Sequence, residues 1–126
     1  MEIRRYYPGQ PTTGVLYGEA LGIGWMSSQE KIEADHQHYI HEGWNRLRIV
    51  AKGPRIQTWV NDQMIEDLVD EEVYRTHKRG FVGLQVHGIN ENDIARPVHA
   101  GRGMTTSQPL IVKWRHIRVR PLARDD

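Results

Sequence analysis

Alternation of apolar and polar residues with a period of two constrains the fold of this chain more than any other feature. It is clearest in residues 44–68, WNRLRIVAKGPRIQTWVNDQMIEDL, which predict a meander of three antiparallel strands. We expect the turns at KGPR and at Asn61-Asp62, because Asn and Asp tolerate the positive φ that a tight hairpin needs. Sustained helical periodicity is hard to find anywhere in the chain.

Other segments alternate in the same way and are expected to be strands, namely residues 2–7, 13–19, 80–88 and 110–122. In the second of these, Val15, Tyr17 and Glu19 would share a face. In the last, the parity slips between Trp114 and Ile117, which predicts a bulge or a strand exposed to two environments.

The connections fit an all-β domain of antiparallel strands. Residues 20–43 and 88–109 show no sustained period and are expected to be long ordered loops, which are often functional. The charged stretch DEEVYRTHKR is compatible with a turn of helix or with an open loop. The alternating strands and their turns together predict an antiparallel sandwich.

Composition excludes several classes of function. With 126 residues the chain is expected to form a single domain, large enough to bury a core. The absence of cysteine excludes disulfides and thiolate metal sites. The 17 basic and 16 acidic residues leave a net charge of +1 without a basic stripe, which argues against nucleic acid as a partner. No apolar run approaches the ~20 residues of a membrane span, and the N-terminus has no apolar signal segment.

The stretch GFVGLQVHG holds the most informative polar residues. In a strand, Val82, Leu84 and Val86 would form a core face, and Gln85 and His87 would lie side by side on the other face. Both are good hydrogen-bonding groups, and the pKa of histidine near ~6.5 suits it to proton transfer. A solvated sheet face is the alternative interpretation.

The tryptophans Trp25, Trp44, Trp59 and Trp114 have two interpretations. Each is large enough to dominate a core, and each could also serve as a platform on which a sugar ring stacks. Trp25 is the best platform candidate because it falls in a predicted loop. Trp59 shares a strand face with Gln57 and is a candidate for the open face of the sheet.

Other polar clusters carry weaker signals. HQHYIH brings His36, His38 and His41 close together, which would suit a metal ion, but no matched carboxylate spacing accompanies them and a polar loop is favoured. Asn90 and Asp93 in NEND offer oxygens suited to Ca²⁺ without the spacing of a calcium loop. Three arginines near the C-terminus could bind anions, although solvated strand charges are favoured; they are Arg115, Arg118 and Arg120.

The ordered set TGVLYGE, WN, TWVN, LQVHG and WRHIRVRPL resembles the 3-keto-disaccharide hydrolase family over residues 2–122. The resemblance implies a concanavalin A-like jelly-roll sandwich whose concave sheet holds sugar. The family usually has Asn-Gly where this chain has Asn61-Asp62. It also has further strands ahead of the segment that begins here, so residues 1–126 are expected to be a single domain that corresponds to the C-terminal portion of the family domain and is an incomplete sandwich.

The resemblance also implies cleavage of glycosides already oxidised to a ketone at C3. A base removes the acidified C2 proton, the enolate expels the C1 substituent, and water adds to the enone. The site needs a base, an acid, and a donor or a divalent cation over the C3 oxygen; no cofactor is assigned, and metal ligands are not identified. The expected catalytic residues are His87, Tyr17 and Glu19. The expected substrate-binding residues are Gln85, Glu2, Trp25 and Trp59.

The expected partner is therefore a carbohydrate, a 3-keto-glycoside, and neither nucleic acid nor a membrane span is expected. Open strand edges would favour homo-oligomers. Two alternatives stay open: a sandwich that binds carbohydrate without catalysis, and a truncated domain that needs association to fold. The sequence assigns no compartment, although the resemblance is compatible with the bacterial periplasm or the extracellular space.

Overall fold

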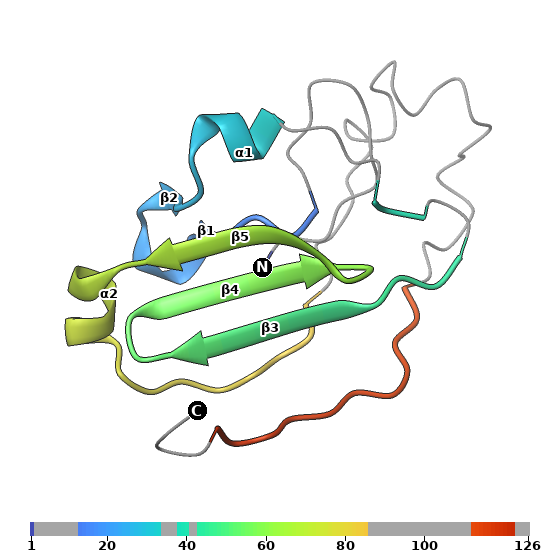
Figure 1. Ribbon diagram of the computed structural model, residues 1–126. Coiled ribbons are helices and arrows are strands. Elements are labelled where there is room, and N and C mark those ends of the chain that lie inside the picture. Colours follow the sequence, from blue (N-terminus) through green and yellow to red (C-terminus); the bar gives the residue numbers. More distant parts are fainter. Residues whose placement is uncertain (2–12, 34–37, 41–42, 86–111, 123–126) are drawn as a thin grey trace, which may run out of the picture. The chain divides into compact units, whose positions relative to one another are not determined.

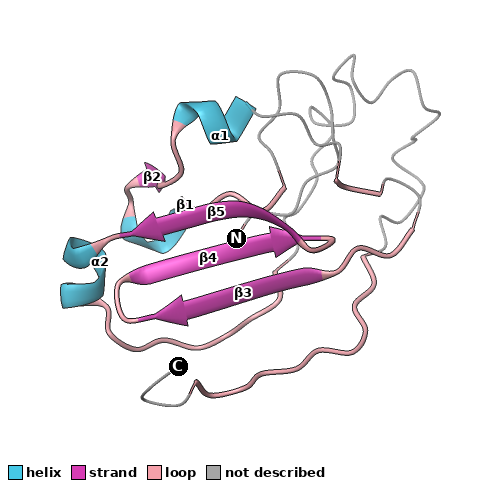
Figure 2. Ribbon diagram, viewed as in Figure 1, coloured by secondary structure: helices cyan, strands magenta, loops and turns pink. Residues whose placement is uncertain are grey.

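The computed structural model describes residues 1, 13–33, 38–40, 43–85 and 112–122. Contacts divide the chain into two compact units, Met1–Gly80 and Phe81–Asp126, and each is described by itself. The strands of the described residues are paired antiparallel, which confirms the all-β prediction (Figures 1 and 2). The jelly-roll closure and the single domain over residues 1–126 stay predictions.

The predicted meander is confirmed, with its turns where the sequence places them. It consists of β3 (Leu47–Lys52), β4 (Arg55–Val60) and β5 (Gln63–Val69) in the order β3-β4-β5. Asn61 and Asp62 both have positive φ, at 48° and 69°. This backbone is the one that a two-residue hairpin of right-handed twist requires.

The turn between β4 and β5 is tied to the segment that enters the meander. The Asn61 side chain accepts from the Arg46 backbone N–H at 2.8 Å and donates to the backbone carbonyl of His38 at 2.5 Å and to Asn45 Oδ1 at 2.8 Å. The Arg46 guanidinium donates to both carboxylate oxygens of Asp62 at 2.9 Å. Asn61 is therefore both the turn residue and the anchor of the incoming chain.

The register of the meander defines two faces. We call the inner face the one that carries Ile56, Thr58 and Val60 of β4 with Glu66 and Leu68 of β5. Thr58, Val60 and Glu66 are buried there, and a bulge lies between Thr58 and Trp59.

The outer face is the opposite one. Its residues are Arg48, Val50 and Lys52 of β3, Arg55, Gln57 and Trp59 of β4, and Asp67 and Val69 of β5. Gln57 and Trp59 are two positions apart on β4, and their partners on β3, Val50 and Arg48, are two positions apart as well. The expectation that Gln57 and Trp59 share a face is therefore confirmed.

Residues 13–16 pack on the inner face. Val15 is fully buried, and the Thr58 hydroxyl donates to the carbonyl of Gly14 at 2.6 Å. Gly14 has φ of 107°, and a Cβ at this position would lie 2.9 Å from Cγ1 of Ile65. Both the left-handed backbone and the close approach to β5 therefore require glycine here.

The prediction of one strand over residues 13–19 is wrong except for two residues near the end of the segment. Only β1 (Tyr17–Gly18) is a strand, and a 3₁₀ turn begins at Glu19 (Glu19–Leu21). The Gly22 N–H donates to the Glu19 carbonyl at 3.3 Å. The chain reverses at this turn, and the following residues form β2 (Gly24–Trp25), which pairs with β1. Val15 is buried while Tyr17 is 40% exposed. These residues and Glu19 therefore do not share a strand face.

The long-loop prediction for residues 20–43 is wrong where the structure forms β2 and α1 (Gln29–Glu33). The Ser28 carbonyl accepts from the Ile32 N–H at 3.0 Å, and Ile32 is buried. A helix of this length is too short to show a helical repeat in the sequence. Its stability comes from packing rather than from propensity.

DEEVYRTHKR does contain a helix, which confirms one of the two interpretations. It is α2 (Glu71–Thr76), and Asp70 is its N-cap, because the Asp70 carboxylate accepts from the Val73 N–H at 2.8 Å. This is the usual capping contact of an aspartate.

In the second unit, Phe81–Gln85 and residues 112–122 are described, and neither segment is a strand. The strand predictions for residues 80–88 and 110–122 are therefore wrong over these parts, because alternation assigns faces but does not supply a hydrogen-bonded neighbour. Phe81 is 97% exposed. His116 has φ of 54°, which lies at the predicted slip of parity. The predicted strand at residues 2–7 is outside the described residues, and association through open strand edges stays a prediction.

We predict that the left-handed backbone at Asp62 makes the stability of the hairpin depend on the residue there. The free energy of unfolding of Asp62→Ala should be lower than that of Asp62→Gly by roughly 1–2 kcal/mol, because only a residue with Cβ resists positive φ. Asp62→Ala should therefore unfold at a lower urea concentration. Both variants lose the exposed ion pair to Arg46, so their difference isolates the backbone term. Equal stability of the two variants would contradict the prediction.

Candidate functional site

The short ribbon formed by β1 and β2 brings together two residues predicted to act in the site. Tyr17 pairs directly with Trp25. The centroids of their rings are 4.7 Å apart with an interplanar angle of 62°, an edge-to-face contact. Tyr17 is 40% exposed and Trp25 is half-buried. The pair therefore offers a phenol and an indole next to each other, on a strand rather than in the loop that was predicted for Trp25.

Glu19 follows β1 directly and is exposed at the start of the 3₁₀ turn. Its carboxylate is thus brought to the end of the ribbon by the reversal of the chain, and not by strand alternation from Tyr17.

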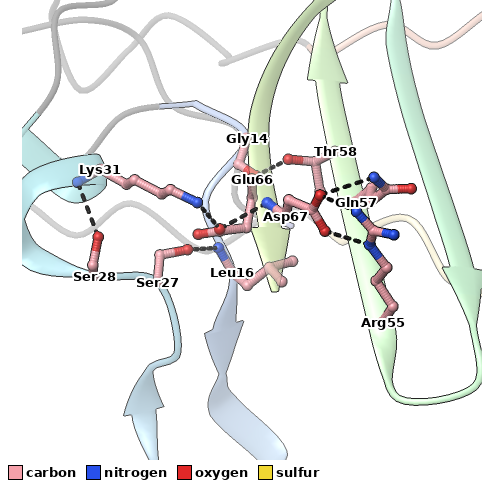
Figure 3. A network of polar contacts seen from close by, with 10 residues as sticks. All are labelled: Gly14, Leu16, Ser27, Ser28, Lys31, Arg55, Gln57, Thr58, Glu66 and Asp67. Atoms are coloured by element: carbon pink, nitrogen blue, oxygen red, sulfur yellow. Dashed lines mark hydrogen bonds and ion pairs between the residues drawn. The ribbon is translucent and has the colours of Figure 1, made fainter. Parts of the chain in front are cut away.

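Backbone and side-chain hydrogen bonds hold this ribbon in place. The Leu16 N–H donates to the Ser27 hydroxyl at 2.8 Å (Figure 3). The Leu16 carbonyl accepts from the Met26 N–H at 3.0 Å. Ser27 is buried. The two ends of the segment that contains Tyr17 and Trp25 are therefore hydrogen-bonded to each other.

A buried carboxylate joins α1 to the meander. Glu66 is 2% exposed, and its Oε1 accepts from the Lys31 ammonium and from the Asp67 N–H at 2.8 Å (Figure 3). Oε2 is also buried and has no hydrogen-bond partner among the described residues. Burial raises the pKa of Glu66, but the hydrogen bonds from Lys31, Ser27 and the Asp67 N–H outweigh it, so the pKa lies below its ordinary value. Glu66 is therefore ionised.

The outer face of the meander carries a second polar arrangement. The Arg48 guanidinium lies 4.6 Å from the centroid of the Trp59 ring. Asp67 accepts from Arg55 at 2.7 and 2.5 Å and from Gln57 at 3.1 Å. The hydrogen bonds from Arg55, above all, lower the pKa of Asp67 to about 2. Trp59 is half-buried on this face, so part of the indole is accessible.

The remaining predicted site residues are Gln85, Glu2 and His87. Gln85 is exposed in the second unit. Glu2 and His87 lie outside the described residues, and their roles stay predictions.

No metal site is found in the part of the chain that the structure describes, since no group of three or more histidine, aspartate or glutamate side chains gathers there. His38 is exposed, and its predicted neighbours His36 and His41 are outside the described residues, as are Asn90 and Asp93. The described helices are all too short or too polar to cross a bilayer. An open depression of about 580 Å³ contains none of the predicted site residues; it is lined by Glu71, Glu72, Tyr74, Arg75 and Lys78.

Sequence reasoning missed the charged residues that organise both faces. Glu66 occupies an inner-face position, opposite Thr58. A carboxylate at a core position of a predicted strand is a signal that a cation or hydrogen-bond donor from another segment compensates it. Lys31 had no such signal, because its partner is distant in sequence.

Comparison with protein families gives a match to the chain. A family model described as 3-keto-alpha-glucoside-1,2-lyase-like domain matches residues 3–120. Neither the curated proteins nor the solved structures contain a significant match to the chain.

We predict that removal of Lys31 leaves a buried charge without a partner. Lys31→Ala should lower the free energy of unfolding by roughly 2–3 kcal/mol, below the ~3–5 of a fully buried pair, because the Lys31 side chain is 39% exposed. Lys31→Arg, which keeps the charge, is the matched control and should lose less. In Lys31→Ala the loss should shrink at acidic pH, where Glu66 takes up a proton. A loss in Lys31→Ala that does not change with pH would argue against an ionised Glu66.

The ion pair between Asp67 and Arg55 predicts a pH dependence of stability. The pKa of Asp67 is held at about 2, below the ~3.9 of an unfolded chain. Its contribution is therefore present above about pH 4 and is lost as the pH falls through about 2. Urea unfolding of the wild type and Asp67→Asn should show a constant difference above that range and a shrinking one below it. A difference that persists unchanged at pH 2 is the contrary result.

Proposed function

Because the chain belongs to the family of 3-keto-alpha-glucoside-1,2-lyase-like domains, we propose that it cleaves 3-keto-glycosides by elimination followed by hydration. The observation that carries this proposal is the match of the family model over nearly the whole chain. The aromatic ribbon of Tyr17 and Trp25 supports it, because a pyranose ring stacks on such a surface.

The chemistry follows from the ketone. The C3 carbonyl acidifies the hydrogen on C2, so that a base of modest strength removes it and forms an enolate. The enolate collapses to a double bond between C1 and C2 as the bond from C1 to the aglycone oxygen breaks, and an acid protonates that oxygen. Water then adds across the double bond, with its hydroxyl on C1 and its proton on C2, and the free 3-keto sugar leaves.

The chain offers residues for each of these steps. His87 is the proposed base or acid, since an imidazole titrates near the working pH. The phenol of Tyr17 is proposed to donate a hydrogen bond to the enolate oxygen on C3, where negative charge develops. Glu19, two residues after Tyr17 in the chain, is proposed to act as the carboxylic acid that protonates the leaving oxygen. A divalent cation at the C3 oxygen is the alternative to the phenol.

Substrate binding is proposed to use the aromatic side chains. Trp25 is held edge-to-face against Tyr17 at 4.7 Å, so that a sugar on the indole lies within reach of the phenol. Trp59 offers a second indole on the outer face of the meander, and Gln85 and Glu2 are proposed to bind hydroxyl groups.

We predict that release of 3-keto-glucose from a 3-keto-glucoside depends on His87 and Tyr17. His87→Ala should lower kcat/KM by roughly 10²-fold or more, as expected for the loss of a general acid or base. Tyr17→Phe should lower kcat by a similar factor if the phenol stabilises the enolate. The matched control is His77→Ala, which removes an exposed histidine at the end of α2 and should leave the rate unchanged.

The same assay with a chelator separates the two enolate stabilisers. Loss of turnover on chelation assigns the C3 oxygen to a metal ion, and turnover that survives assigns it to the protein donor. Full activity of a well-folded His87→Ala variant would refute the role of His87. If folded wild-type protein binds sugar but shows no turnover, the domain is a non-catalytic carbohydrate-binding domain and not an enzyme.

A further inference from the structure

The outer face of the meander has an excess of positive charge in the described part of the chain. It carries three cationic side chains, Arg48, Lys52 and Arg55, and one carboxylate, Asp67. The chain as a whole has a net charge of only +1. The positive charge is therefore concentrated on one sheet face and is not a property of the whole surface.

Asp67 neutralises only one of these cations. Its two carboxylate oxygens accept from Arg55 at 2.7 and 2.5 Å. The next carboxylate along the chain, Asp70, caps α2 through the Val73 N–H at 2.8 Å. Among the described residues, no ion pair to Arg48 or Lys52 is found.

The register places two of the cations against each other. Lys52 and Arg55 are directly opposite across β3 and β4. The Arg55 charge is already paired with Asp67, whereas Lys52 has no ion pair among the described residues. Lys52 is therefore the cation that favours a negatively charged ligand at this end of the face.

At the other end, a cation and an aromatic ring are combined. Arg48 lies over the Trp59 ring at 4.6 Å from its centroid, a stack that orients the guanidinium. An oriented guanidinium binds carboxylate or sulfate with two parallel hydrogen bonds. The accessible part of the Trp59 indole offers an apolar surface to the ring that carries such a group.

Arg48 and Lys52 lie on one strand, four positions apart, which corresponds to about 13 Å along the strand. That distance exceeds the width of one sugar ring. From the charge, the stacked Arg48 and this spacing, we infer that the outer face binds acidic oligosaccharides, with carboxylate or sulfate groups on separate sugar units. The inference deepens the proposed function by naming the class of glycan, and it rests on that function for the identity of the ligand as a sugar.

The test measures binding of polymers that differ in charge. Affinity electrophoresis of the wild type through gels containing polygalacturonate, dextran sulfate or neutral dextran should show retardation by the acidic polymers and little by neutral dextran. Galacturonic acid monomer should not compete at concentrations at which a tetragalacturonate does. Added salt should weaken the binding, since the cations are exposed. Preference for polygalacturonate over dextran sulfate identifies carboxylate as the group bound, and the reverse preference identifies sulfate.

Variants locate the binding on the outer face. The double variant Arg48→Gln with Lys52→Gln should lower affinity for the acidic polymer by 10-fold or more. The matched control is Arg75→Gln with Lys78→Gln, which removes the same charge from exposed positions on and after α2 and should change affinity less than 2-fold. Both double variants should still unfold cooperatively in a thermal melt, because the substituted side chains are exposed.

The inference is overturned by equal retardation in neutral and acidic gels, or by equal losses in the two double variants, which would reduce the effect to net charge. Its failure is distinguishable from failure of the proposed function. Polymer binding requires neither the 3-keto group nor His87. Turnover of a 3-keto-glucoside without binding of acidic polymers would support the proposed function and overturn the inference. Binding of acidic polymers without turnover would support the inference and count against the proposed function.

Discussion

The buried carboxylate of Glu66 is the constraint on which the packing of α1 on the meander depends. It lies on the inner face of β5, where an unpaired charge would be costly, and the Lys31 ammonium compensates it. This contact brings α1 against the meander, and the hydrogen bond from Thr58 to the Gly14 carbonyl brings in residues 13–16 beside it. The ribbon that carries Tyr17 and Trp25 lies between these two attachments in the chain, so its position follows from them.

The two faces of the meander differ in how their polar side chains are paired. On the inner face, the polar groups of Thr58 and Glu66 are used to attach other segments of the chain. On the outer face, Asp67 is satisfied by Arg55 and Gln57, whereas Arg48 is stacked on Trp59 without a carboxylate partner among the described residues. The same three strands can therefore hold the core with one face and offer charge and an indole to a ligand with the other.

The prediction of the fold succeeded where all the determinants were local. The turn at Asn61 and Asp62 and the alternation in β3, β4 and β5 each involve residues close in sequence. It failed where the outcome depended on distant partners. The reversal after Gly18 and the absence of strand pairing at Phe81–Gln85 and residues 112–122, within the described chain, are not encoded in alternation, because a pleat assigns faces without choosing neighbours.

The candidate site divides in the same way. Sequence alone determined which residue types could perform the proposed elimination and hydration. The sequence also resembles a family whose model matches residues 3–120, and this resemblance indicated the proposed class of substrate. Only the tertiary structure decided that Tyr17 contacts Trp25, that Arg48 lies over Trp59, and that Lys31 neutralises Glu66. The physical reason is that a side chain's identity fixes what it can donate, accept or stack on, whereas the partner that makes use of this capacity is brought to it by strand register and by the packing of segments distant in sequence.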